Sequence, residues 1–285
     1  MSALFEVRDL RKTFRSGRGM SGRGATTVAV DGVSFDVERG SCYGLVGESG
    51  SGKSTTARML CRLLTPDSGE VSLDGDDIVE LRGATLKAFR RRVQMVFQDP
   101  FASLDPRWKV GSLVAEGMRI HGHVPRDRRP ARIADLLERC GLRPEHADAH
   151  PHEFSGGQRQ RIGIARALAV EPDVLVLDEP VSALDVSIRA QILALLDELR
   201  AELGLTYVFI AHDLAVVERF CDRLAVMRDG EIVEEGTPAD VYRTPAHPYT
   251  RALLDAVPVP DPRHRDEFAP PDESTPASSS TSGGP

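Results

Sequence analysis

The chain has 285 residues, of which 41% are hydrophobic and 28% charged, as is typical of a globular protein with one large domain or two small ones. A formal net charge of −7 argues against a broadly basic surface, so we expect no nucleic acid as a partner. No apolar run approaches the roughly 20 residues that a membrane helix needs, and the acidic N-terminus lacks a signal-peptide pattern, which predicts a soluble, cytoplasmic chain.

The first hundred residues alternate short apolar runs with a helix-length segment, the pattern of an α/β domain. Strands are predicted at 4–7, 33–37, 42–46 and 93–97, and a helix at 55–64. Between the first two strands, residues 15–27 are rich in Gly, Ser and Arg and predict a surface loop.

The pattern changes after the strand at 93–97. Residues 99–154 contain no strong strand pattern, and apolar side chains follow helical spacing at 133–140. We interpret residues 99–158 as a helical insertion in the α/β core. The core then resumes with helices at 156–170 and 187–203, strands at 174–177 and 206–210, and a hairpin of 224–227 with 231–235.

The C-terminal end differs from the rest in composition. From Pro258 onward, 16 of 28 residues are Pro, Ser, Thr or Gly, which leaves too few apolar side chains to offset the entropy of ordering the chain. We therefore predict one folded domain over residues 1–257 and a disordered tail over residues 258–285.

Four cysteines are spread along the chain without the close spacing of metal ligands. They are Cys42, Cys61, Cys140 and Cys221. Free, buried thiols in a reducing compartment are expected in preference to a disulfide or a metal site.

A glycine-rich segment follows the strand at 42–46 and opens the helix at 55–64. It fits the phosphate-loop pattern, in which glycines turn backbone N–H groups toward phosphate oxygens and the helix N-terminus favours negative charge. We expect Lys53 to contact the β- and γ-phosphates of ATP and the Ser54 hydroxyl to ligate Mg²⁺. The expected ATP-binding residues are Gly47, Glu48, Ser49, Gly50, Ser51, Gly52, Lys53, Ser54 and Thr55.

Two acidic residues, Asp178 and Glu179, end the apolar strand at 174–177. Downstream of a phosphate loop, this arrangement indicates a Walker B strand. Asp178 is expected to hold Mg²⁺, and Glu179 to polarise the water that attacks the γ-phosphate. Surface capping by the two acids is the alternative, and a kinase, a GTPase or a RecA-like motor would carry the same two motifs.

The segments around these motifs resemble those of the ABC ATPases. Phe154-Ser155-Gly156-Gly157-Gln158 is similar to the signature motif of the family, with Phe in place of the usual Leu. Gln98 resembles the Q-loop glutamine, Ser182-Ala183-Leu184-Asp185 the D-loop, and His212 the switch histidine. Phe14 stands where the family has an aromatic residue that stacks on adenine, and packing in the core is the alternative for this side chain.

The resemblance covers residues 1–257 and implies an α/β fold of the ABC type: a P-loop ATPase with a RecA-like core, an N-terminal antiparallel β subdomain and an inserted helical subdomain. It implies catalytic roles for Glu179, His212 and Gln98, with Gln98 also touching Mg²⁺. In the implied head-to-tail dimer, a second ATPase subunit supplies the other wall of each ATP site. The residues that act across this dimer are Ser155, Gly156, Gly157, Gln158 and Asp185.

Four further segments resemble the ATPase subunits of oligopeptide and dipeptide importers, namely 96–100, 102–107, 184–187 and 247–254. This branch implies peptide import through a membrane permease that receives its solute from an extracytoplasmic binding protein, with the ATPase peripheral on the cytoplasmic face of the membrane. Close relatives handle nickel and other small solutes, and an exporter is a further alternative. The polar tail does not match the Cys- and Pro-containing C-terminal segment of many relatives, so we expect no iron–sulfur site.

Other classes of ABC ATPase fit less well. A DNA-acting member normally inserts coiled coils or zinc modules, and the chain has neither sustained heptads nor a Cys cluster. A ribosome-associated factor normally carries two sets of motifs, whereas one set is present here. Glu179 and His212 argue against a regulatory subunit that does not hydrolyse ATP. The sequence leaves open whether the dimer pairs two copies or two different subunits.

Overall fold

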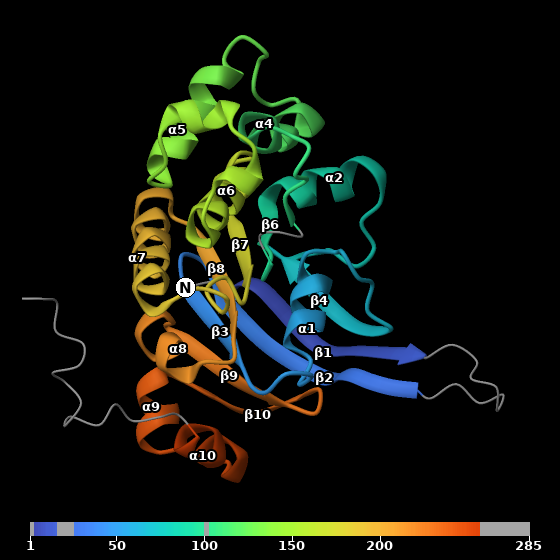
Figure 1. The fold of residues 1–285 in the computed structure, drawn as a ribbon. Helices are drawn as coiled ribbons and strands as arrows, with labels where there is room; N and C mark the ends of the chain where they lie inside the picture. The colour runs from blue at the N-terminus through green and yellow to red at the C-terminus, as the bar shows by residue number, and fades with distance from the viewer. Residues whose placement is uncertain (1–2, 16–25, 100–102, 257–285) are drawn as a thin grey trace, which may run out of the picture.

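The computed structural model describes residues 3–15, 26–99 and 103–256, which form two sheets with surrounding helices (Figure 1). The predicted tail at 258–285 and most of the predicted loop at 15–27 lie outside the described residues. Within the described ranges, no helix combines the length and the apolar composition that crossing a bilayer requires.

The first sheet is antiparallel and comes from the N-terminal part of the chain. It contains β1 (Ala3–Arg15), β2 (Thr26–Glu38), β4 (Ser68–Leu73) and β5 (Asp76–Asp77), in the order β2-β1-β4-β5. Along β1, buried Phe5 and Val7 alternate with exposed Glu6 and Arg8, because successive side chains of a strand point to opposite faces. The N-terminal antiparallel β subdomain of the predicted fold class is therefore confirmed.

The second sheet lies at the centre of the molecule. Its strands are β3 (Cys42–Val46), β6 (Val93–Val96), β7 (Val174–Asp178), β8 (Thr206–Ala211), β9 (Arg223–Arg228) and β10 (Glu231–Gly236). Their order is β10-β9-β3-β8-β7-β6, parallel from β9 through β6, with β10 antiparallel to β9 as the predicted hairpin. Every residue of β3 and β7 is buried, as expected for strands covered on both faces.

Alternate residues of the parallel sheet face two separate hydrophobic cores. Cys42 and Val46 of β3 pack in a core shared with the helices of the second half, whereas Tyr43 and Leu45 pack in a core shared with the antiparallel sheet. All four cysteines are buried free thiols, three in the first core and Cys61 in the second, as predicted. The parallel sheet is packed between the two cores, and this packing fixes the positions of its strand ends.

Helices cover the sheet and connect its strands. They are α1 (Lys53–Leu60), α2 (Gly83–Arg92), α6 (Gly156–Leu168), α7 (Val186–Leu203), α8 (Leu214–Phe220), α9 (Pro238–Arg243) and α10 (Pro248–Asp255). The predicted helix at 55–64 is wrong at its C-terminal end, because α1 stops at Leu60 and Arg62 has a positive φ of 51°. Short helices such as α8 and α9 carry too few turns for a clear period, so the sequence pattern does not predict them.

The segment between β6 and α6 forms the helical insertion. It contains α4 (Val110–His121), α5 (Arg129–Arg139) and two 3₁₀ helices, η1 (Pro144–Asp148) and η2 (Pro151–Glu153). Its described part contains no strand. Figure 1 shows α4 and α5 at one end of the molecule, opposite the end formed by α9 and α10.

Candidate functional site

Several strands of the parallel sheet end at one edge, where the candidate site lies. β3, β8 and β7 are neighbours, and their carboxyl ends lead into the glycine-rich segment, His212 and Glu179 respectively. β6, next to β7, ends at Val96, shortly before Gln98. Open α/β sheets hold ligands at this edge because loops from several strands converge there.

The loop after β3, residues 47–54, is the predicted phosphate loop, and it requires glycine for both conformation and packing. Gly47 has a φ of 148° and Gly52 a φ of 108°, which L side chains rarely adopt. A Cβ on Gly47 would lie 2.2 Å from the Met227 carbonyl oxygen, and one on Gly52 would lie 2.4 Å from that of Ala29. The phosphate loop therefore lies directly against neighbouring backbone and leads into the N-terminus of α1, a position that favours anions.

The Lys53 side chain is folded back into the phosphate loop. Its Nζ donates hydrogen bonds to the Gly47 carbonyl at 2.7 Å and the Glu48 carbonyl at 2.8 Å, and lies 3.4 Å from Ser51 Oγ. Only 4% of Lys53 is exposed, and burial lowers the pKa of its ammonium group in spite of nearby carboxylates. The phosphate loop thus encloses a buried positive charge.

Ser54 and Asp178, two of the residues expected to ligate Mg²⁺, are in contact. Ser54 Oγ donates a hydrogen bond to Asp178 Oδ1 at 2.8 Å. Asp178 is 3% exposed, and burial raises the pKa of its carboxyl group although the bond from Ser54 opposes the shift. No cluster of three or more His, Cys, Asp or Glu ligands occurs in the part of the chain that the structure describes. The two oxygen donors fit a hard cation that completes its shell with water and phosphate oxygens.

The three residues expected in catalysis meet at the Glu179 carboxylate, which contacts both Gln98 and His212. Its Oε2 accepts a hydrogen bond from Gln98 Nε2 at 2.9 Å and lies 3.2 Å from His212 Nδ1. The Glu179 backbone has a positive φ of 46°, uncommon for a residue other than glycine, and its N–H donates to the Ile210 carbonyl. Residues from the ends of three strands therefore converge on one carboxylate.

The predicted signature segment begins a helix instead of joining this cluster. Ser155 is the N-cap of α6: its Oγ accepts from the Gln158 N–H at 3.4 Å, and Gln158 Oε1 accepts from the Ser155 N–H at 3.0 Å, which makes a capping box. A Cβ on Gly157 would lie 2.4 Å from Ile188 Cγ2, so this helix start packs closely on α7. Over the described ranges, no hydrogen bond joins residues 155–158 to the phosphate loop.

Asp185 and Phe14, two further predicted site residues, form no hydrogen bond with the phosphate loop or with Glu179 in the described part of the chain. Asp185 is the N-cap of α7, and its pKa is lowered by hydrogen bonds from the Ile188 N–H at 2.9 Å and the Ser187 hydroxyl at 2.8 Å. Phe14 lies near the end of β1 with 43% of the residue exposed, and Lys12 Nζ is 5.9 Å from its ring centroid. The alternative that Phe14 packs in the core is therefore wrong, and its ring is accessible for stacking.

Tyr249 of α10 contacts the phosphate loop, which no local sequence pattern predicts. Its hydroxyl accepts a hydrogen bond from the Glu48 N–H at 3.1 Å. The two residues are 201 positions apart in the chain. Their contact depends on how the last helix packs, and the sequence carries no short-range signal for that packing.

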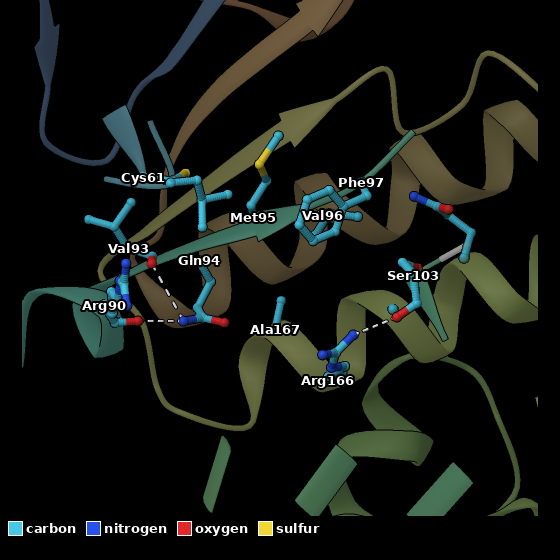
Figure 2. Close-up of a pocket in the computed structure, with 13 residues that line it drawn as sticks. Cys61, Arg90, Val93, Gln94, Met95, Val96, Phe97, Ser103, Arg166 and Ala167 are labelled. Carbon is cyan, nitrogen blue, oxygen red and sulfur yellow. Dashed lines mark hydrogen bonds between the residues drawn. The ribbon is translucent and has the colours of Figure 1, made fainter. Parts of the chain in front are cut away.

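A pocket of about 180 Å³ lies between β6 and α6 (Figure 2). Its lining includes Met95, Val96 and Phe97, the three residues before Gln98, and Phe97 is 40% exposed. Figure 2 shows Arg166 of α6 pointing toward Ser103, whose carbonyl accepts a hydrogen bond from Arg166 Nη1 at 2.8 Å. The pocket is therefore lined both by the sheet edge beside Gln98 and by the helical insertion.

Comparison with known proteins gives two family matches. A family model described as ABC transporter matches residues 30–182, and one described as the C-terminal region of oligopeptide/dipeptide transporters matches residues 233–284. The oligopeptide transport ATP-binding protein OppF of Streptococcus mutans is 51% identical over 260 residues, which cover 91% of this chain and 83% of the relative. A putative peptide import ATP-binding protein of Brucella ovis is 51% identical over 264 residues, which cover 93% and 81%.

A similar solved structure is an ATP-binding cassette. It was determined as a dimer in a post-hydrolysis state, bound to ADP and phosphate. It aligns with a TM-score of 0.72 and 30% identity over 82% of this chain and 98% of that chain. The first family match spans the phosphate loop, the Glu179 cluster except His212, and the signature segment. The second spans α9 and α10 and continues into the predicted tail, so the expected departure of the tail from the C-terminal segment of these relatives is wrong.

Proposed function

This chain belongs to the ATP-binding subunits of ABC transporters, as predicted, and we propose that it hydrolyses ATP to drive import of oligopeptides or dipeptides through a membrane permease. The observation that carries the peptide class is the match of residues 233–284 to the C-terminal region of oligopeptide/dipeptide transporters. Two relatives at 51% identity, each covering more than nine tenths of the chain, are named for peptide transport or import and support the same class.

The phosphates of ATP are proposed to bind at the phosphate loop and the N-terminus of α1. Lys53 is already buried inside this loop, and turning one of its N–H donors outward brings it to the β- and γ-phosphates. The exposed ring of Phe14 is proposed to stack on the adenine base.

Mg²⁺ is proposed to bind between Ser54 and Asp178, whose oxygens are already 2.8 Å apart. When bound, this ion neutralises charge that develops on the phosphate oxygens. Gln98 is proposed as a further ligand, because its amide nitrogen faces Glu179 and leaves its amide oxygen for the metal.

Glu179 is proposed to polarise the attacking water. Gln98 and His212 both approach its Oε2, so they orient the carboxylate and leave Oε1 for the water. A general base must first be held within hydrogen-bond reach of the water, and its pKa then determines how well it accepts the proton.

A second ATPase subunit is proposed to complete the site. Ser155 is exposed at the N-terminus of α6, which favours an anion, yet its capping bonds go to Gln158 of the same turn. The similar cassette solved as a dimer supports a site shared by two chains. Gly156, Gln158 and Asp185 are proposed to lie on the same surface toward the partner subunit, whereas Gly157 is buried against α7.

The permease is proposed to contact the pocket between β6 and α6. Exposed Phe97 lines this pocket next to Gln98, and Ser103 of the helical insertion borders it, so a helix seated there would respond to closure of the ATP site. An extracytoplasmic solute-binding protein and a position on the cytoplasmic face of the membrane belong to the same proposal.

Deletion of the gene in its own organism tests the solute class. Uptake of a radiolabelled tripeptide should be lost and should return with the parent chain, but not with Glu179→Gln. Nickel uptake, measured in the same cells, is the matched control and should stay unchanged. Loss of nickel uptake with unchanged peptide uptake would overturn the proposed substrate class.

A further inference from the structure

The C-terminal helix α10 reaches the phosphate loop through one side chain. The Tyr249 hydroxyl accepts a hydrogen bond from the Glu48 N–H at 3.1 Å, and no other hydrogen bond joins α10 to this loop in residues 3–15, 26–99 and 103–256. The Tyr249 residue is 9% exposed, and the Arg228 guanidinium lies over its ring, 5.0 Å from the centroid. Packing around the ring therefore holds the hydroxyl in place.

The hydrogen bond acts on the first peptide group of the phosphate loop. The Gly47 carbonyl and the Glu48 N–H belong to the same peptide group, and in a trans peptide they point in opposite directions. Lys53 Nζ donates to the Gly47 carbonyl at 2.7 Å, whereas Tyr249 accepts from the Glu48 N–H. This peptide group is thus held from both sides, by Lys53 within the loop and by Tyr249 from α10.

In the described residues, Gly47 packs against the Met227 backbone, but no third hydrogen bond reaches this peptide group. Gly47 has no side chain to limit its rotation and already has a φ of 148°. A pocket of about 470 Å³ separates residues 48–51 from part of α10 and the turn at Arg228. A hydrogen bond that crosses this open space therefore has a large share in setting the conformation of the loop.

α10 is itself fixed to the edge of the parallel sheet. The Glu234 carboxylate of β10 accepts hydrogen bonds from the Ala246 N–H at 2.8 Å and the His247 N–H at 3.0 Å. His247 Nδ1 in turn accepts from the Tyr249 N–H at 3.2 Å. The sheet thereby sets the position of Tyr249, which makes this tyrosine a rigid support for the loop.

We propose that Tyr249 is a positioning residue of the ATP site, which holds the Gly47–Glu48 peptide group when Lys53 turns toward the phosphates. An ammonium group has three N–H donors, and those of Lys53 face the two carbonyls of Gly47 and Glu48 and the Ser51 hydroxyl. Each N–H of Lys53 that turns to a phosphate oxygen no longer donates a hydrogen bond to the phosphate loop. Tyr249 then supplies the remaining side-chain restraint, so the C-terminal region sets the ATP affinity of a loop 201 positions earlier.

Tyr249→Phe tests this role because it removes the hydroxyl and keeps the ring beside Arg228. Loss of one hydrogen bond that preorganises the loop is expected to raise the Kd for ATP about 3- to 10-fold. Calorimetry on the purified full chain without Mg²⁺ measures this Kd while preventing hydrolysis. Hydrogen exchange of the Glu48 amide should also become faster in the variant.

Tyr207→Phe is the matched control. Tyr207 is buried in β8 and its hydroxyl donates to the Leu196 carbonyl at 2.8 Å, so the variant also loses one hydrogen bond to the backbone. Its thermal stability should fall while its Kd for ATP stays at the parent value. Parent-like affinity in Tyr249→Phe, or equal shifts in both variants, would overturn the proposal. The test needs neither a peptide nor a permease, so its result is independent of the proposed transport function.

Discussion

The two proposed walls of the ATP site differ in how their polar groups are satisfied. In the phosphate-loop wall, buried charged groups already contact their partners: Lys53 lies inside the loop and Asp178 accepts from Ser54. In the helix-start wall, residues 155–158, Ser155 is exposed and is capped by its own turn. The first wall is therefore assembled within one chain, and the second presents a free surface.

Because of this difference, ATP binding and ATP hydrolysis are expected to depend on different walls of the site. Folding has already placed the charges of the phosphate-loop wall, so a nucleotide can bind there without a large rearrangement. At the helix start, an arriving phosphate competes with a hydrogen bond of 3.4 Å from the Gln158 N–H to Ser155, which is long and therefore weak. We infer that ATP binding needs one chain and that efficient hydrolysis needs both walls.

The largest expected effect comes from Glu179→Gln, which alters the chemistry of the phosphate-loop wall and keeps its shape. Removal of a general base lowers the rate by about 10²–10⁴-fold, and ATP should then hold two chains together. Phosphate release gives the rate, and gel filtration with ATP gives the dimer. The control is Glu198→Gln, at an exposed position of α7, which should hydrolyse ATP like the parent. Parent-like hydrolysis by Glu179→Gln would mean that another group activates the water.

Ser155→Arg attacks the helix-start wall alone. A bulky cation at this N-cap should block approach of a second chain and lower hydrolysis by about 10²-fold, the usual cost of losing a donor to developing charge. Binding of ATP to the single chain should stay unchanged, as measured by calorimetry without Mg²⁺. Lys53→Ala is the contrasting variant and should lose that binding. If Ser155→Arg also loses ATP binding by the single chain, both walls of the site belong to one chain, and the proposed two-chain site is wrong.

Most of the phosphate-loop wall could be predicted, because local patterns mark each part of it. The phosphate loop follows one continuous apolar strand, and Asp178 and Glu179 end another. The capping pair of Ser155 and Gln158 is also readable from its spacing. The meeting of Gln98 with Glu179 required the family resemblance as well, because it depends on the order of strands in the sheet.

The remainder depends on weak or long-range signals. β4 places only Val71 and Leu73 in the core, which is too few for a clear alternation, so the sequence pattern does not predict this strand. The contact of Tyr249 with Glu48 joins residues 201 positions apart. The expectation that Ser155 faces a second chain rests on the family resemblance of the signature motif, because the spacing of these residues alone predicts only a helix cap.

Asp178→Asn sharpens the comparison by separating stability from chemistry. Burial raises the pKa of the Asp178 carboxyl group, so its ionised form destabilises the folded state at neutral pH. The amide can still accept from Ser54. We therefore expect this variant to have a higher Tm than the parent at pH 7. Calorimetry of the nucleotide-free chain measures this gain, while hydrolysis should be lost.

The pH dependence of that gain checks its cause. Because the folded pKa of Asp178 lies above the unfolded one, the folded state holds more protons between the two values. The stability of the parent therefore falls as the pH rises through this window. Below it, Asp178 is protonated in both states, and the parent and Asp178→Asn should be equally stable. A gain that persists at low pH would rule out burial of the charge as its origin.

The smallest expected effect belongs to Gln158→Ala, which opens the capping box of the helix-start wall. The variant loses the acceptor for the Ser155 N–H, but alanine favours the helix, so the two contributions nearly cancel. We expect a change below about 0.5 kcal/mol, within roughly 2 °C in Tm. The Kd of the single chain for ATP should not change, because the Gln158 side chain forms its hydrogen bond within its own turn. A weaker Kd would show that this turn already touches the nucleotide in one chain, and the separation of the two walls would then be wrong.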